Sequence, residues 1–327
     1  MTTLVNPAPS PLSTDPKQPG LRRQAGGWRL LSQACSLGLG TVGLVLVALV
    51  VGLALLGPWI APHSPVEFVG VPFQSPAPDL LLGADILGRD VLSRVLAGGY
   101  NILTLAAVAT VMGVGAGALL GMMAGYLKGM LDEVTMRLLD VAMAFPQTIL
   151  ALLFVSIIGP KMWLITLMVA VIHAPQVARV ARAATLRVAE EDFVRFAEAI
   201  GMSRWKIMLR EIFPNIVNPL LVELGLRFTY SIALIAGLSF LGFGQQPPAA
   251  DWGLMINENR IGMAQNPWPV VVPILLIAVL TIGMNLFTDA VARKVLGLAE
   301  TGGGTAGDQR SDVLPGIARA ADPGPTA

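Results

Sequence analysis

Long apolar segments with few or no charged side chains recur along this chain and dominate its pattern. The six that we identify are residues 36–60, 101–126, 141–158, 162–178, 216–243 and 269–288. A helix of about 20 predominantly apolar residues can cross the hydrocarbon core of a bilayer. The pattern therefore predicts an all-α membrane protein with about six transmembrane helices. The third and fourth segments are the shortest and form a tight hairpin around Gly159 and Pro160.

Composition supports a membrane protein over a large soluble helical core. Charged residues make up 13% of the chain, about half of the usual fraction of about 25%. The apolar residues form runs and do not follow the 3.6-residue period of amphipathic soluble helices. The net charge of +1 gives no support for a nucleic-acid partner. The single cysteine, Cys35, excludes an internal disulfide, and we expect His63 and His173 to be interfacial residues, with no metal site.

The ends of the chain differ in composition from the apolar middle. Residues 1–30 are rich in Pro, Thr and Ser and have no apolar core, so we expect a disordered tail rather than a cleavable signal. We expect the first transmembrane helix within 31–60, an external segment with an amphipathic helix at 61–99, and a five-helix core at 100–297. Residues 298–327 form a second predicted disordered tail, whose Gly-rich run lacks the ending of a phosphate loop.

Lysine and arginine positions set the expected orientation. Basic residues precede the first span, crowd the loop between the fourth and fifth spans, and follow the sixth. An even number of spans places these three segments on one side, which the positive-inside rule makes cytoplasmic. Both termini and the loop at 179–214 are therefore expected in the cytoplasm.

The charged stretch at 190–214 is the most distinctive part of the sequence. It is too polar to sit in lipid, and apolar residues recur in it at helical intervals. Pro175 and Pro214 bracket the loop, Gly201 interrupts the pattern, and Ser203 can cap a second helix that carries Trp205. Two interpretations stay open from composition alone: a helix that touches a soluble partner, or one that rests on lipid headgroups.

Four motifs make the chain similar to a known family. The segments LLGADILGRDVLSRVLAGG (81–99), LDEVTMRLLDVAMAFP (131–146) and LSFLGFGQQPPAADWG (238–253), together with the loop AEAIG and its Ile-Phe-Pro end, follow one another in order. They resemble the C-type permease subunit of dipeptide, oligopeptide and nickel importers of the ATP-binding-cassette (ABC) class. The loop resembles that family's Glu-Ala-Ala motif, but Arg195 stands where the family has Glu, with Phe196 and Ala197 at the two Ala positions.

The resemblance implies a type I ABC importer permease fold and a non-catalytic, multi-pass subunit in a bacterial inner membrane. Its implied partners are a homologous second permease subunit, two ATPase domains and an extracytoplasmic substrate-binding protein, besides membrane lipid. The chain lacks a Gly-x-x-x-x-Gly-Lys-Ser/Thr segment, so ATP and magnesium are expected in the partner ATPase subunits and no cofactor on this chain. The ATPase-coupling residues that the resemblance implies are Arg195, Phe196, Ala197, Glu198, Ala199, Gly201, Trp205 and Pro214. For Trp205 a lipid anchor is the alternative.

Two further groups of residues are candidates. Glu223 and Arg227 lie one helical turn apart, either as an ion pair at the cytoplasmic mouth of the pathway or as solvated side chains. An external lid or docking segment is predicted at Asp85, Gly88, Arg89, Asp90 and Arg94, with a self-capped amphipathic helix as the alternative.

Import of di- or oligopeptides is the leading function on this resemblance. Nickel or glutathione import remains open within the same family. An ion-coupled secondary transporter would show inverted repeats and a midplane acid, neither of which is clear here. A membrane enzyme would need a catalytic constellation, and none is evident.

Overall fold

The computed structural model describes residues 38–295, and nearly all of its regular structure is helical. The predicted tails at 1–30 and 298–327, and Cys35, lie outside the described residues. The elements in chain order are α2 (Gly38–Ile60), α3 (Val91–Leu127), α4 (Gly129–Ala144), α5 (Gln147–Ile158), α6 (Met162–Val188), α7 (Asp192–Ala199), α8 (Arg204–Ile207), the π-helix η1 (Met208–Ile212), α9 (Phe213–Phe240), α10 (Trp252–Asn259), the 3₁₀ turn η2 (Arg260–Gly262) and α11 (Trp268–Val295).

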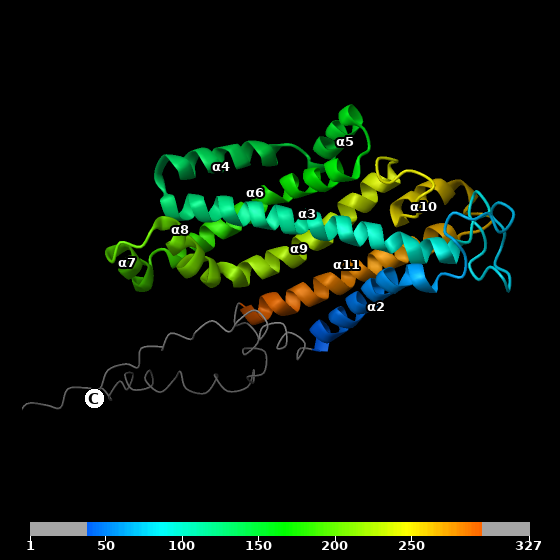
Figure 1. The fold of residues 1–327 in the computed structure, drawn as a ribbon, viewed down its shortest axis with the longest axis horizontal. Coiled ribbons are helices and arrows are strands. Elements are labelled where there is room, and N and C mark those ends of the chain that lie inside the picture. Colours follow the sequence, from blue (N-terminus) through cyan, green and yellow to red (C-terminus); the bar gives the residue numbers. More distant parts are fainter. Residues whose placement is uncertain (1–37, 296–327) are drawn as a thin grey trace, which may run out of the picture.

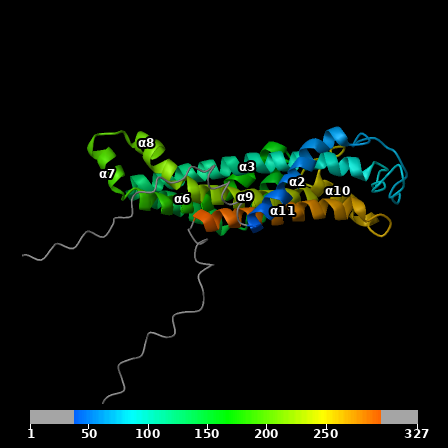
Figure 2. The same ribbon diagram turned by 90° about the horizontal axis from the view of Figure 1, so that it is seen from below.

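The helices form an elongated bundle with different structures at its two ends (Figures 1 and 2). Five helices in the described residues are long and apolar enough to cross a membrane, or six if the bent pair α4 and α5 is one span. Helix α3 runs through the bundle and packs against α6, α9 and α2, and α2 pairs with α11. The short helices α7 and α8 lie at one end, and the irregular segment 61–90 lies at the other.

Glycine allows α3 and α6 to approach closely. The apolar run at 101–126 carries glycines at 113, 115, 117, 121 and 125, and such small residues predict close contact with another helix. A Cβ added at Gly121 would lie 2.2 Å from the carbonyl oxygen of Ala178, and one at Gly117 would lie 2.6 Å from that of Ala174. Gly113 and Gly125 also face α6, whereas Gly115 faces open space. Small residues on facing helices permit the van der Waals contact that holds membrane helices together. The prediction is therefore confirmed for four of the five glycines and is wrong for Gly115.

The expectation of one continuous helix over 141–158 is wrong. The chain breaks between α4 and α5, whose axes are bent by 81°. Proline disfavours the helical conformation of the residue before it, and Phe145, which precedes Pro146, is extended with φ −88° and ψ 136°. Helix α4 buries none of its residues. Its Asp132 instead receives two hydrogen bonds from the Arg182 guanidinium of α6, at 2.5 and 2.6 Å.

The second span starts earlier than the apolar run indicates. Helix α3 begins at Val91, and the Asp90 side chain caps it by accepting hydrogen bonds from the backbone N–H groups of Leu92 and Ser93. The residues just before the cap form turns, so the separate amphipathic helix expected within 61–99 is absent from this external segment as the structure describes it. The apolar stripe at 91–96 instead belongs to the first turns of α3.

The two prolines do not bracket the charged loop as expected. Pro175 lies inside α6, which continues to Val188, and Pro214 lies in the first turn of α9. A helical run extends from residue 204 to 240 through the π-helix η1. Proline is tolerated where its missing N–H has no intrahelical partner or where neighbouring helices satisfy the freed carbonyl. The connection between the long helices is therefore only residues 189–203, and it contains α7.

Candidate functional site

Helix α7 is a short amphipathic helix that presents one face to the bundle and the other outward. Val194 is fully buried and Ala197 is 4% exposed, and both pack into a core with residues of α3, α6, η1 and α9. On the opposite face Phe196 is 66% exposed. Trp205, in α8, is 55% exposed. The helices α7 and α8, which carry these two exposed aromatic side chains, lie at one end of the molecule (Figure 2).

Ala197 does not take the position that we expected. The predicted coupling residues Ala197, Ala199 and Gly201 have small side chains, which would let the helix settle into a partner groove, but Ala197 packs against its own bundle. Ala199 and Gly201 are exposed. Gly201 has φ +77°, and nothing lies within 4 Å of an added Cβ. Glycine is needed there because the left-handed conformation disfavours other residues, and the bend sets the angle between α7 and α8.

Glu198 anchors α7 to the bundle. The Tyr126 hydroxyl at the end of α3 donates a 2.8 Å hydrogen bond to Glu198 Oε1. Arg195 is exposed beside it, in a polar hollow that Lys128 and Glu190 also line. An acid is therefore present in this helix three residues after the position where the resemblance leads us to expect one. The sequence offered no signal for the contact with Tyr126, which joins residues 72 positions apart.

Glu223 and Arg227 form the expected ion pair inside α9. Arg227 Nε lies 2.9 Å from Glu223 Oε2, and each side chain is 11% exposed. The Arg227 guanidinium also donates to Gln176 Oε1 of α6 and lies 5.3 Å from the centre of the Tyr230 ring. The alternative of two solvated side chains is therefore wrong. Gln176 and Tyr230 were not identified from the sequence.

His173 is not the interfacial residue that we expected. It lies inside α6 and is 1% exposed. Its Nε2 lies 3.1 Å from the Ser231 hydroxyl, which lies 3.0 Å from the Thr110 hydroxyl. This chain of polar groups joins α6, α9 and α3 in the apolar part of the bundle. An ionisable residue within a predicted span is itself a signal of function in membrane proteins, and the sequence therefore contained a reason to single out His173.

The predicted lid residues at the other end are buried. Asp85 and Arg94 have no exposed surface and Arg89 is 2% exposed. Asp85 Oδ2 lies 2.7 Å from Arg89 Nε and 3.1 Å from Arg94 Nη1. Glu258 of α10 completes the cluster, with its Oε2 3.0 Å from Arg89 Nη2 and 2.9 Å from Arg94 Nη2. Burial raises the pKa of Glu258, and the positive charge of Arg89 opposes that rise.

Gly88 and Asp90 are also buried, and their roles are structural. Gly88 has φ +78°, and an added Cβ would lie 2.2 Å from the carbonyl oxygen of Gly70. Asp90 caps α3 and accepts a hydrogen bond from the Ser93 hydroxyl. The five predicted residues thus hold segment 61–90 onto α3 and α10 and do not form its outer surface. Exposed apolar side chains lie nearby instead, at Phe68, Val71 and Leu81.

The bundle, the broken α4–α5 pair and the outward amphipathic helix together define a class: an integral membrane permease whose loop helix is displayed at one end. The chain belongs to the family of binding-protein-dependent transport system inner membrane components, whose family model matches residues 117–297. It is therefore a multi-pass inner-membrane protein and a transport permease subunit.

Relatives are similar to this chain over most of its length. A dipeptide transport system permease protein, DppC, of Haemophilus influenzae is 32% identical over 257 residues, covering 76% of this chain and 87% of that protein. A glutathione transport system permease protein, GsiD, of Pectobacterium atrosepticum is 33% identical, covering 80% and 87%. A putative peptide transport system permease protein of Brucella suis is 36% identical, covering 78% and 86%. Permeases of this family work with ATPases and substrate-binding proteins, which agrees with the partners expected from the sequence.

Proposed function

We propose that this chain forms one half of the translocation pathway of an ATP-driven importer for di- or oligopeptides. The other half is a homologous permease subunit, so that the pathway is a heterodimer. Two ATPase domains, which bind ATP and magnesium, dock on the cytoplasmic side, and a substrate-binding protein delivers the peptide from outside. The end that carries α7 and both termini face the cytoplasm. Relatives that are named as dipeptide and peptide transport permeases support this substrate class.

The observation that carries the proposal is the exposed aromatic face of α7 and α8. Phe196 and Trp205 are large, rigid side chains on short helices that Val194, Ala197 and Ile207 hold in place from below. Aromatic side chains in partner pockets dominate the binding energy of many interfaces. A groove in the ATPase that receives Phe196 would move α7 when ATP binds. The Tyr126–Glu198 hydrogen bond and the packing of Val194 would pass this movement to α3 and α9.

Helix α4 offers a surface for the second permease subunit. Its apolar residues Met130, Val134, Leu138 and Val141 are each more than half exposed and recur at helical spacing. Lipid would also cover such a face, but the ion pairs from α6 to Asp132 and Asp140 hold α4 in a fixed position. A fixed apolar helix can pack specifically against another subunit.

Glutathione import is the second candidate because a glutathione permease is among the relatives. Glutathione is itself a small peptide, so the two functions differ in the binding protein and in substrate contacts. Nickel import would place the metal contacts in the binding protein.

A reciprocal pair of variants tests which end of the molecule binds the ATPase subunits and which binds the substrate-binding protein. Phe196 of α7 and Phe68 of segment 61–90 are the same residue type with similar exposure, 66% and 70%. We expect Phe196→Ser to reduce copurification of the ATPase subunits by about ten-fold or more, since loss of a central aromatic anchor commonly costs about 2 kcal/mol. Phe68→Ser should retain the ATPase and weaken binding of the substrate-binding protein. Equal retention of the ATPase by both variants would contradict the proposed docking.

A further inference from the structure

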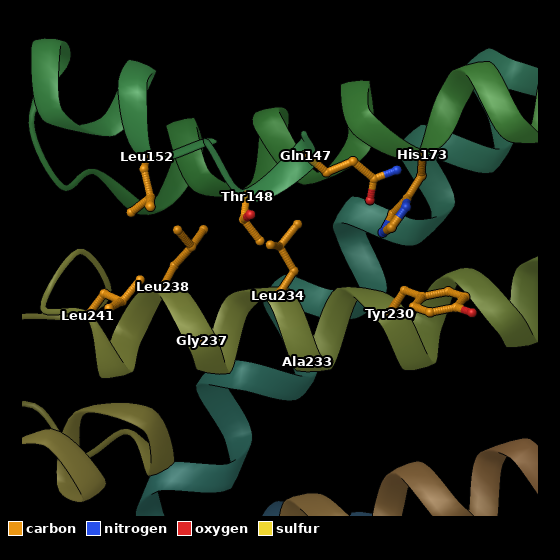
Figure 3. A pocket seen from close by; sticks show the side chains of 10 residues that line it. All are labelled: Gln147, Thr148, Leu152, His173, Tyr230, Ala233, Leu234, Gly237, Leu238 and Leu241. Carbon is orange, nitrogen blue, oxygen red and sulfur yellow. The ribbon is translucent and has the colours of Figure 1, made fainter. Parts of the chain in front are cut away.

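A cavity of about 310 Å³ lies between the first turns of α5 and the interior parts of α6 and α9 (Figure 3). Its volume is at the lower end of the range for small-molecule sites, about 300 to 1,000 Å³. Gln147 and Thr148 line it from α5, His173 from α6, and Tyr230 and Leu234 from α9. The break between α4 and α5 creates this space, because a straight helix through 141–158 would not place the start of α5 here.

His173 lines the cavity and carries an unsatisfied polar atom. Its Nε2 is held by Ser231, which contacts Thr110, but its Nδ1 is buried and has no hydrogen-bond partner in the described part of the chain. A buried polar atom without a partner is costly in an apolar surrounding. The contact with Ser231 fixes the ring, so the free nitrogen stays in place for a ligand.

The lining combines neutral polar groups with apolar surface. The Gln147 amide and the Thr148 and Tyr230 hydroxyls supply hydrogen-bonding groups, and Leu152 and Leu234 supply apolar contacts. No charged side chain lines this cavity. The nearby Arg227 is already paired with Glu223 and Gln176. This chemistry fits a neutral amide next to an apolar side chain.

We propose that this cavity is a subsite of the transport pathway that receives one peptide unit of the substrate during passage. The amide of the substrate hydrogen-bonds to His173 Nδ1, and its apolar side chain packs on Leu152 and Leu234. The inference rests on the proposed function and adds the place where this chain touches the peptide. A lipid acyl chain or an apolar helix of the partner would leave the His173 nitrogen unsatisfied, which favours the peptide.

The test uses the complete complex of both permeases, the ATPases and the binding protein in proteoliposomes, with labelled Leu-Leu and Gly-Gly as probes. Leu152→Trp fills the cavity, and Leu241→Trp fills it from a rim position that is 53% exposed and accepts bulk more easily. Leu153→Trp is the matched control. Leu153 lies next to Leu152 in α5, is 53% exposed like Leu241, and is outside the cavity. We expect both cavity variants to lower the ratio of Leu-Leu to Gly-Gly uptake several-fold, and the control to keep the wild-type ratio.

A second arm tests the polar contact. His173→Leu should reduce uptake of both dipeptides by about ten-fold, the effect expected for one lost hydrogen bond, and His173→Gln should restore much of it by returning a polar atom.

Three results would count against the proposal. If the wild-type complex imports dipeptides but both cavity variants keep its uptake ratio, the subsite is refuted while the proposed function stands. If Leu152→Trp and Leu241→Trp instead release the second permease subunit, the cavity is a contact between permeases and the subsite is also refuted. If the wild-type complex imports neither dipeptide with ATP, the proposed function itself is refuted, and the subsite that rests on it is refuted with it.

Discussion

Two sets of buried charged side chains in the described residues form ion pairs, and they differ in how far apart their members lie in the sequence. The pair Glu223 and Arg227 lies four residues apart in one helix and could be predicted from that spacing. The cluster of Asp85, Arg89 and Arg94 with Glu258 joins residues more than 160 positions apart. Arg89 and Arg94 run against the positive-inside trend for an external segment, and the sequence places acidic residues such as Asp85 near them. The sequence could not identify Glu258 as their partner, because the fold alone brings α10 against α3.

A double-mutant cycle tests the Glu223–Arg227 pair. Arg227→Met leaves the Glu223 carboxylate without its partner at a site where each side chain is 11% exposed. We expect this substitution to lower the free energy of unfolding by about 3 kcal/mol, the usual cost of breaking a buried ion pair. Adding Glu223→Gln should recover more than half of the loss because the unpaired charge is gone. The loss and the recovery are both determined by measuring the free energy of unfolding of each variant in detergent. Additive losses from the two single variants would show that the side chains do not interact.

At the scale of elements, the sequence predicted the apolar helices and their close contacts, but it predicted the breaks between helices less well. The glycines of α3 predicted a close helix contact, and four of them face α6. Gly115 could not be distinguished from them without knowing which face of α3 meets α6. The break before α5 had a local signal in Pro146, but the apolar run through 141–158 outweighed it. The charged loop was recognisable, whereas its helix boundaries depend on how Pro214 and η1 fit into the continuous run to Phe240.

The contact between α3 and α6 can be tested with one substitution at two glycines. Gly121→Val adds bulk where even a Cβ would lie 2.2 Å from the Ala178 carbonyl oxygen, and Gly115→Val adds the same bulk in open space. We expect the first to destabilise the protein by about 2 kcal/mol or more through overpacking, and the second to change stability by less than about 0.5 kcal/mol. Thermal unfolding in detergent distinguishes them. Similar unfolding temperatures for the two variants would mean that α3 and α6 do not pack closely at Gly121.

The two ends of the whole molecule differ in structure. One end displays aromatic side chains on α7 and α8, and the other holds a rigid external segment through buried ion pairs. Between them, α3 and α9 reach from the neighbourhood of α7 into the bundle and carry the polar groups at Thr110, Ser231 and Arg227. In the proposed function, a movement of α7 would pass along these helices toward the cavity beside His173. Family membership and the span pattern were predictable from the sequence, but this connection was not.

ATP-dependent uptake by the reconstituted complex tests the central claim most directly, namely that this chain couples a partner's ATP hydrolysis to import through α7. Proteoliposomes that contain both permeases, the ATPases and the binding protein should accumulate labelled dipeptide when ATP is supplied. Phe196→Ser should reduce this uptake by about ten-fold or more, while Phe68→Ser keeps the ATPase bound. Uptake that proceeds without ATP, driven by an ion gradient, or that is unchanged by Phe196→Ser, would contradict the account.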